Sequence, residues 1–247
     1  MLLLAPFALQ AMPVTVTSNH IESLSYDNGT WISDSTNNTS IPFSAILSAT
    51  SGNSSSVTDV DWTGGDNFVL FDASFNHNIN NSDDTTGGFD YAQTYQSTIA
   101  FSANDDSAYA LSGLYDFNIS NGGRSYYDVY LRDDTQGIDL FRDTTISTTG
   151  GDLSQIFNLG VGGDGNTYNI TLGSLTGNLI AGNNYSFYFE TNIITLHDQL
   201  NTQGAGVASG NVALLIGDPS LVPEPMSFAL MILGLFALGQ RPFTRNR

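Results

Sequence analysis

The chain has 247 residues, of which 40% are hydrophobic and only 12% are charged, so Asn, Ser, Thr and Gly must supply most of its surface polarity. Its six basic residues are all arginine and face 24 acidic residues, 21 of them aspartate, a balance that repels phosphate and excludes nucleic-acid binding. The absence of cysteine excludes disulfides, thiolate zinc sites, iron–sulfur clusters and cysteine nucleophiles.

The first segment, residues 1–11, is almost entirely apolar. Leu2 to Leu9 resembles the apolar core of a secretory signal peptide, and Ala11 supplies a small residue at the cleavage point. No basic residue precedes this core. We therefore expect either a truncated signal peptide whose true start lies upstream or a hydrophobic first strand. The acidic, lysine-free body favours the signal peptide, and hence export.

The body, residues 12–221, alternates apolar and polar side chains with a period of two, which predicts about a dozen strands and no amphipathic helix. The expected strands lie at residues 13–18, 24–33, 41–49, 56–62, 67–73, 96–102, 108–120, 125–132, 137–146, 168–174, 185–195 and 207–216. Turn signals such as Asn28-Gly29 separate them, and the segment from His77 through Gly88 is polar enough to be a loop. The sequence therefore predicts an all-β, antiparallel β-sandwich or jelly-roll-like ectodomain.

One polar stretch has the spacing of a calcium-binding loop. Asp59-Val60-Asp61-Trp62-Thr63-Gly64 places oxygen ligands at alternate positions before a glycine, as in the first half of an EF-hand loop, although Leu70 replaces the acidic residue expected at the twelfth position. The candidate calcium ligands are Asp59, Asp61, Thr63, Asp66 and Asp72. The alternative is that these aspartates only solvate a polar turn.

A second candidate site follows from the alternation of the strand expected at 125–132. Tyr126, Asp128, Tyr130 and Arg132 share one face, where flat rings beside hydrogen-bonding groups would suit a glycan. The next strand offers Asp139 or Arg142, whose spacing predicts opposite faces. The alternative is that both rings pack beneath a second sheet and that Asp128 and Arg132 form an ordinary cross-strand salt bridge.

Catalytic patterns are not found. His20, His77 and His197 lie far apart, without metalloprotease or nucleophile-elbow spacing. Glu190 falls on the polar face of its strand and is expected to be solvated, so it supplies no defined acid–base pair. We expect no catalytic residue and a non-enzymatic protein.

The chain ends in a composite segment, residues 222–247. Val222-Pro223-Glu224-Pro225 precedes fifteen mostly apolar residues, 226–240, that predict a hydrophobic helix of about 22 Å, shorter than a bilayer core of about 30 Å. The basic end, 241–247, contains Arg241, Arg245 and Arg247. Prolines keep the Val222–Pro225 peptide extended and accessible, and the arginines hold the far end on the cytoplasmic side of a membrane.

This tail closely resembles the PEP-CTERM sorting signal of Gram-negative bacteria, which the Gly234-Leu235 pair within the helix also matches. Pro242-Phe243-Thr244 departs from the usual unbroken arginine cluster. The resemblance implies transient insertion in the inner membrane, recognition and cleavage by an exosortase-like protease, and delivery to the cell surface or the medium alongside exopolysaccharide.

The sequence thus predicts an exported, acidic surface or extracellular-matrix protein without enzymatic activity. The alternative from another class is a calcium-dependent carbohydrate-binding module, and a third is a secreted glycan hydrolase. The tail is compatible with all three, because a sorting signal specifies destination and not activity.

Overall fold

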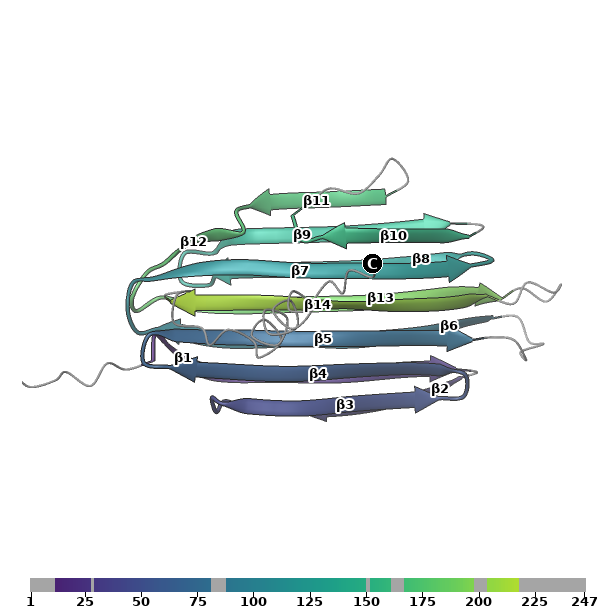
Figure 1. Cartoon of the computed structure of the whole chain (residues 1–247), viewed down its shortest axis with the longest axis horizontal. Coiled ribbons are helices and arrows are strands. Elements are labelled where there is room, and N and C mark those ends of the chain that lie inside the picture. The colour runs from purple at the N-terminus through teal and green to yellow at the C-terminus, as the bar shows by residue number, and fades with distance from the viewer. Residues whose placement is uncertain are drawn as a thin grey trace, which may run out of the picture.

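The computed structural model describes residues 12–27, 29–80, 88–149, 152–160, 167–197 and 204–217. Antiparallel strands make up most of this part of the chain, and no helix occurs within it (Figure 1). The all-β, antiparallel prediction is confirmed. The predicted signal segment 1–11 and the predicted tail 222–247, including its helix, lie outside the described residues.

The strands form two seven-stranded sheets. Sheet A has the order β11–β9–β8–β13–β6–β1–β2, and sheet B has the order β10–β7–β14–β5–β4–β3, with β12 paired to β7. The strands of sheet A are β11 (Thr167–Gly173), β9 (Ile138–Thr149), β8 (Gly123–Asp133), β13 (Asn184–His197), β6 (Gly88–Ala103), β1 (Val14–Asp27) and β2 (Thr30–Thr36). Those of sheet B are β10 (Leu153–Asn158), β7 (Ser107–Ser120), β14 (Ala205–Gly217), β5 (Phe68–Asn80), β4 (Ser54–Gly65), β3 (Phe43–Ser51) and β12 (Thr176–Leu179).

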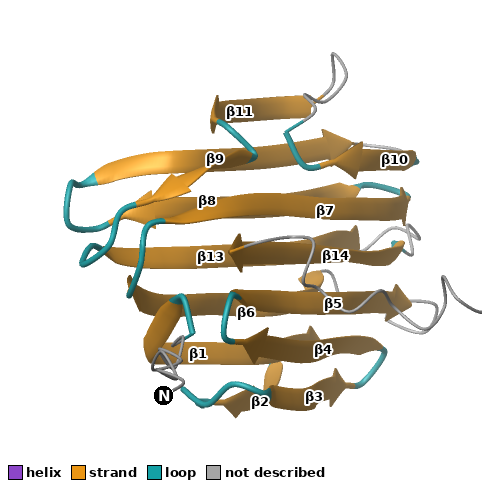
Figure 2. Cartoon of the chain, turned by 60° about the vertical axis from the view of Figure 1, so that its left-hand side comes forward, coloured by secondary structure: helices purple, strands orange, loops and turns teal. Residues whose placement is uncertain are grey.

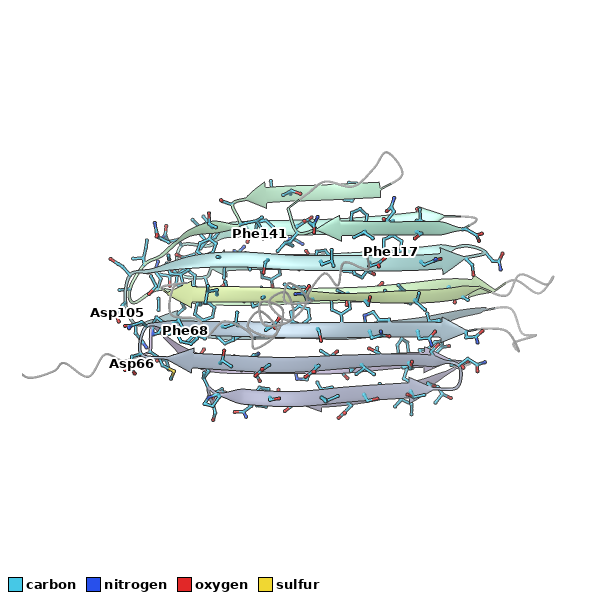
Figure 3. All side chains as sticks on the ribbon, in the orientation of Figure 1. Asp66, Phe68, Asp105, Phe117 and Phe141 are labelled. Carbon is cyan, nitrogen blue, oxygen red and sulfur yellow. The ribbon has the colours of Figure 1, made fainter. Side chains whose placement is uncertain are left out.

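The two sheets lie face to face (Figure 2). Hairpins join β1 to β2, β3 to β4, β4 to β5 and β8 to β9, whereas every other connection carries the chain from one sheet to the other. Each sheet is therefore assembled from strands far apart in the sequence. Figure 3 shows the side chains on both faces of the ribbons, and one face of each sheet contributes to a shared core.

Aromatic rings pack together in this core. Trp62 meets Phe71 edge to face at 5.3 Å, and Phe71 contacts Phe101 of the opposite sheet at 5.9 Å between ring centroids. All three side chains are buried. Truncating such a ring to alanine costs about 3–5 kcal/mol, so this region holds the sheets together.

A chain of hydrogen-bonded polar side chains also crosses the core, beside the ring of Phe75, which stacks on His77. Ser23 of sheet A donates to Ser56 of sheet B at 2.8 Å, Ser56 bonds His77 Nδ1 at 3.1 Å, and His77 Nε2 bonds Thr191 back in sheet A at 2.9 Å. Burial lowers the pKa of His77 to about 3, so the ring is neutral. A neutral imidazole has one donor and one acceptor nitrogen, which suits a hydroxyl on each side.

Several strand boundaries differ from expectation. β5 continues through Asn80, so residues 77–80, expected in a loop, are strand with His77 inside the core. β1 is one strand of 14 residues, and β10 and β12 were not predicted. β12 has only four residues, too few to show an alternation of its own.

Candidate functional site

The predicted glycan-binding residues lie on the outer face of sheet A. Tyr127, Val129 and Leu131 are the β8 residues that enter the core, which leaves Tyr126, Asp128, Tyr130 and Arg132 on the opposite side. The interpretation that the two rings pack beneath the second sheet is therefore wrong. The alternation was recognised correctly, but both phases of β8 carry aromatic residues, and the more apolar phase faces inward.

Tyr130 stands between two flat groups. Its ring stacks on Tyr188 of β13 with centroids 4.7 Å apart and planes 12° from parallel. The Arg142 guanidinium lies over the Tyr130 ring at 5.7 Å. Tyr188 and Arg142 are its direct cross-strand neighbours, on β13 and β9 respectively. Groups on both sides thus restrict access to the faces of the ring, and its edge is the part left to meet a ligand.

Asp128 is saturated by its neighbours. Its Oδ1 accepts from the Thr144 hydroxyl at 2.7 Å, and its Oδ2 accepts from Tyr126 and from Arg142, each at 3.2 Å. Only 4% of the residue is exposed although it faces outward. Asp128 therefore holds β8 against β9 in a cross-strand salt bridge, whose partner is Arg142 of β9 and not Arg132 of its own strand.

Glu190 lies directly across from Asp128 on β13. It accepts from Tyr188 at 2.7 Å and from Asn192 at 3.3 Å. Burial raises its pKa above the usual value for glutamate, an effect that these hydrogen bonds oppose. Glu190 is thus half-buried and bonded, which corrects the expectation that it is solvated.

Arg132 belongs to a neighbouring ion pair. It donates to Asp139 at 2.9 Å. A bulge between Leu131 and Arg132 in the β8–β9 register makes Asp139 the partner of Arg132, and Arg142 the partner of Tyr130, on the same face. The prediction of opposite faces for Asp139 and Arg142 is wrong because sequence spacing alone does not show the bulge.

The calcium candidates occupy a strand rather than a loop. Asp59, Asp61 and Thr63 alternate along β4, and Asp61 lies directly opposite Asp72 of β5 on the outer face of sheet B. Asp66 is in the turn at the end of these strands (Figure 3). Five residues separate it from Asp61, about 15 Å of extended chain, so the two cannot share one ion.

Asp72 is the most perturbed of these acids. Burial raises its pKa, and the negative charges of Asp61 and Asp59 raise it further. Its Oδ1 is buried without a hydrogen-bond partner in the described structure. Nevertheless, no group of three or more acidic or histidine residues in the described ranges is arranged to hold a metal ion. Calcium binding stays a prediction.

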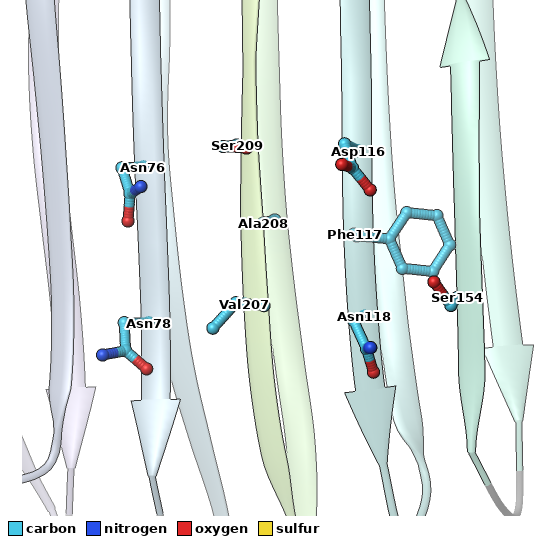
Figure 4. Close-up of a pocket in the computed structure, with 9 residues that line it drawn as sticks. All are labelled: Asn76, Asn78, Asp116, Phe117, Asn118, Ser154, Val207, Ala208 and Ser209. Carbon is cyan, nitrogen blue, oxygen red and sulfur yellow. The ribbon is translucent and has the colours of Figure 1, made fainter.

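Sequence reasoning missed a concave feature on sheet B. Side chains of β5, β14, β7 and β10 surround a hollow of about 430 Å³ (Figure 4). We call it the β14 trough; it is lined by Asn76, Asn78, Asp116, Phe117, Asn118, Ser154, Val207, Ala208 and Ser209. In the sequence, Asp116 and Asn118 alternate with apolar residues, which is a usable signal for an outward-facing position. The alternation does not show which strands lie beside them.

Three sets of residues named from the sequence lie outside what the structure describes. They are the sorting motif Val222, Pro223, Glu224 and Pro225, the basic residues Arg241, Arg245 and Arg247, and the side chain of His197. In the ranges that it does describe, no helix has the length and apolar character needed to cross a bilayer.

Fold and site together define an all-β protein of two antiparallel sheets. On the outer face of sheet A the polar side chains are hydrogen-bonded to one another, and the outer face of sheet B carries the β14 trough. No family model matches the chain, and no curated protein does. Two solved structures of infectious bursal disease virus, strains Gt and Gx, align at 10% identity with TM-scores of 0.18 and 0.19. These alignments cover 94% and 92% of this chain, and 77% and 74% of the viral chains. Such TM-scores are too low to carry an argument about fold or function.

Proposed function

We propose that the protein is an exported bacterial surface or extracellular-matrix component without enzymatic activity. Its sheets form a jelly-roll-like ectodomain, and its tail, with a hydrophobic helix at 226–240, inserts transiently in the inner membrane before an exosortase-like protease removes it. The ectodomain then resides at the cell surface or in the medium, in contact with exopolysaccharide. The acidic, lysine-free composition and the resemblance of the tail to PEP-CTERM signals support this destination.

One observation carries the non-enzymatic part of the proposal. Asp128 and Glu190 are the two carboxylates at the centre of the sheet A face, and each is bonded by its own neighbours. A glycosidase needs one carboxyl group to deliver a proton and another to attack or to activate water. Carboxylates bound in this way support a structural role over a catalytic one.

The tail is tested by processing in the producing bacterium. We expect the mature protein to lose the mass of the tail, and we expect deletion of the exosortase, or Glu224→Ala, to leave the tail attached and the chain in the membrane fraction. Asp105→Ala, an exposed acidic position between β6 and β7, is the matched control. Intact mass spectrometry of both fractions gives the answer. Normal cleavage of Glu224→Ala would contradict the role of the motif.

The alternative, a calcium-dependent carbohydrate-binding module, is favoured by one feature, the directly opposed Asp61 and Asp72 with the raised pKa of Asp72. A cation between these carboxylates would relieve their repulsion. Calorimetric titration with calcium should then show saturable binding that Asp61→Asn abolishes. Titrations that show no heat of calcium binding would contradict this alternative and leave the proposal above unchanged.

A further inference from the structure

The β14 trough is formed by a strand of short side chains between two strands of longer polar ones. Ser209 lies between Asn76 of β5 and Asp116 of β7, and Val207 lies between Asn78 and Asn118 in the next outward-facing row. Figure 4 shows these side chains on either side of β14. Two strand spacings of about 4.8 Å separate the walls, so the trough is about 10 Å across at the level of the backbone.

The trough continues along the strands. A second hollow of about 340 Å³ shares Asn78, Asn118 and Val207 with the first and extends to Asn80 and Ser120. From Asn76 to Asn80 the β5 wall alone spans about 14 Å at about 3.4 Å per residue. Three asparagines repeat along this wall, because alternate residues of a strand face the same side. The site is linear and open along its length.

The polar side chains around the first hollow have no hydrogen-bond partners in the described part of the structure. The side chains of Asn76, Asn78 and Asn118 make no hydrogen bond within the described part of the structure, and neither do those of Asp116 and Ser209. This is the reverse of the sheet A face, where Asp128 alone receives three hydrogen bonds. The wall groups are therefore available to a ligand without the loss of any internal bond.

The chemistry of the walls selects a neutral, hydroxyl-rich ligand. Each asparagine offers two N–H donors and a carbonyl acceptor, which matches a hydroxyl group that both donates and accepts. Val207 is 52% exposed and gives the floor an apolar surface for the C–H groups of a sugar ring. A polyanion is disfavoured by Asp116 and by the formal charge of −18.

Cations and peptides fit less well. Asp116 is the one carboxylate among the residues that line the first hollow, whereas calcium takes six to eight oxygen ligands, usually with several acids. A peptide that adds a strand needs a sheet edge, but β14 is paired on both sides, with β5 and with β7. The length of the trough also exceeds what one sugar unit needs, which favours the interior of a chain.

We infer that the β14 trough binds an uncharged polysaccharide chain lying along β14, without a metal ion. This inference deepens the proposed function and rests on it for the presence of polysaccharide around the protein. Asn76, Asn78 and Asn118 supply hydrogen bonds, and Val207 supplies the apolar floor. The site lies on the opposite sheet from the predicted tyrosine face and apart from the Asp61–Asp72 pair.

The test uses the full chain purified in mild detergent, with three neutral polysaccharides (dextran, mixed-linkage β-glucan and galactomannan) and alginate as the polyanion. Affinity gel electrophoresis and calorimetry measure binding with and without EDTA. We expect saturable binding of at least one neutral polymer, unaffected by EDTA, and none of alginate. Asn78→Ala combined with Asn118→Ala should weaken this binding at least tenfold, which corresponds to a loss of about 1.4 kcal/mol or more from the hydrogen bonds of the two side chains.

A blocking variant keeps the test decisive should the double variant unfold. Ser209→Tyr places a ring in the trough from an exposed position and should abolish binding while the thermal unfolding midpoint is unchanged. Asn158→Ala, an exposed asparagine of β10 on the same outer face, is the matched control, and Tyr126→Ala tests the sheet A face. Both should bind as the unaltered chain does.

Three results would overturn the inference: no binding of any neutral probe, binding that EDTA abolishes, or undiminished binding by Ser209→Tyr. None of them bears on tail processing, which mass spectrometry measures separately. Failure of the trough is therefore distinguishable from failure of the proposed export and sorting.

Discussion

The outer faces of the two sheets follow the same alternation of strand residues, yet their polar side chains have different partners. On sheet A, Asp128, Arg142 and Glu190 are held by neighbouring side chains, and Tyr130 is stacked between Tyr188 and Arg142. On sheet B, the asparagines along the β14 trough have no such partners in the described structure. Polar residues on a strand can thus support the sheet or serve a ligand, and composition does not tell which.

The largest expected effect is on sheet A. Asp128→Ala removes the acceptor shared by Arg142, Thr144 and Tyr126, and should lower the free energy of unfolding by about 2 to 3 kcal/mol. The value is below that of a fully buried pair, because the Arg142 side chain is 40% exposed. Urea denaturation measures it. A loss below about 0.5 kcal/mol would show that the network does not support the sheet.

The interior gives a second comparison, because His77 also lies among polar groups that satisfy each other. Its pKa is about 3 when folded and about 6.5 when unfolded, so below pH 6.5 the unfolded chain binds a proton that the folded chain refuses. Stability from this group is complete above about pH 6.5 and falls with pH, by about 2 kcal/mol at pH 5.

The matched variant for this prediction is His77→Gln, which keeps hydrogen-bonding atoms but does not titrate. Unfolding free energies at pH 7 and pH 5 should differ by about 2 kcal/mol less in the variant than in the unaltered chain. Since the carboxylates are the same in both proteins, their titration cancels. Equal pH dependence in the two proteins would mean that the pKa of His77 is not lowered in the folded state.

The smallest expected effect is on sheet B. Asn78→Ala with Asn118→Ala should change the free energy of unfolding by less than about 0.5 kcal/mol per site, because neither side chain has a hydrogen-bond partner among the residues that the structure describes. The same denaturation experiment applies. A large loss of unfolding free energy would show that these asparagines stabilise the fold and that the two outer faces do not differ in this way.

The sequence predicted the fold class and most strands, because alternation is a local signal. In β7, for example, the apolar Tyr115 and Phe117 alternate with the polar Asp116, and the structure buries the two aromatic residues. For β8 the choice of phase was open, since Tyr126 and Tyr130 alternate with Tyr127. Burial then depends on which phase the second sheet covers, and this is decided by residues far away in the chain.

The candidate site was less accessible to sequence reasoning. Asn78, Asn118 and Val207 come from strands about 40 and 90 residues apart, and asparagine within a polar stretch is typical of turns. The trough exists because β14 carries shorter side chains where β5 and β7 carry longer ones, a match that depends on the register of the three strands. The partner of Asp128 was missed for a similar reason, the bulge that shifts β9.

The position of β14 has a kinetic consequence. It is the last described strand, yet it lies in the middle of sheet B and pairs with residues as distant as Phe68. Until residues 205–217 are available, β5 and β7 have no common neighbour and their backbone edges are exposed. Folding that depends on such distant contacts is slow, and the unpaired strand edges of β5 and β7 stay exposed until it is complete. A chain interrupted before residue 205 should therefore aggregate rather than form a smaller sheet.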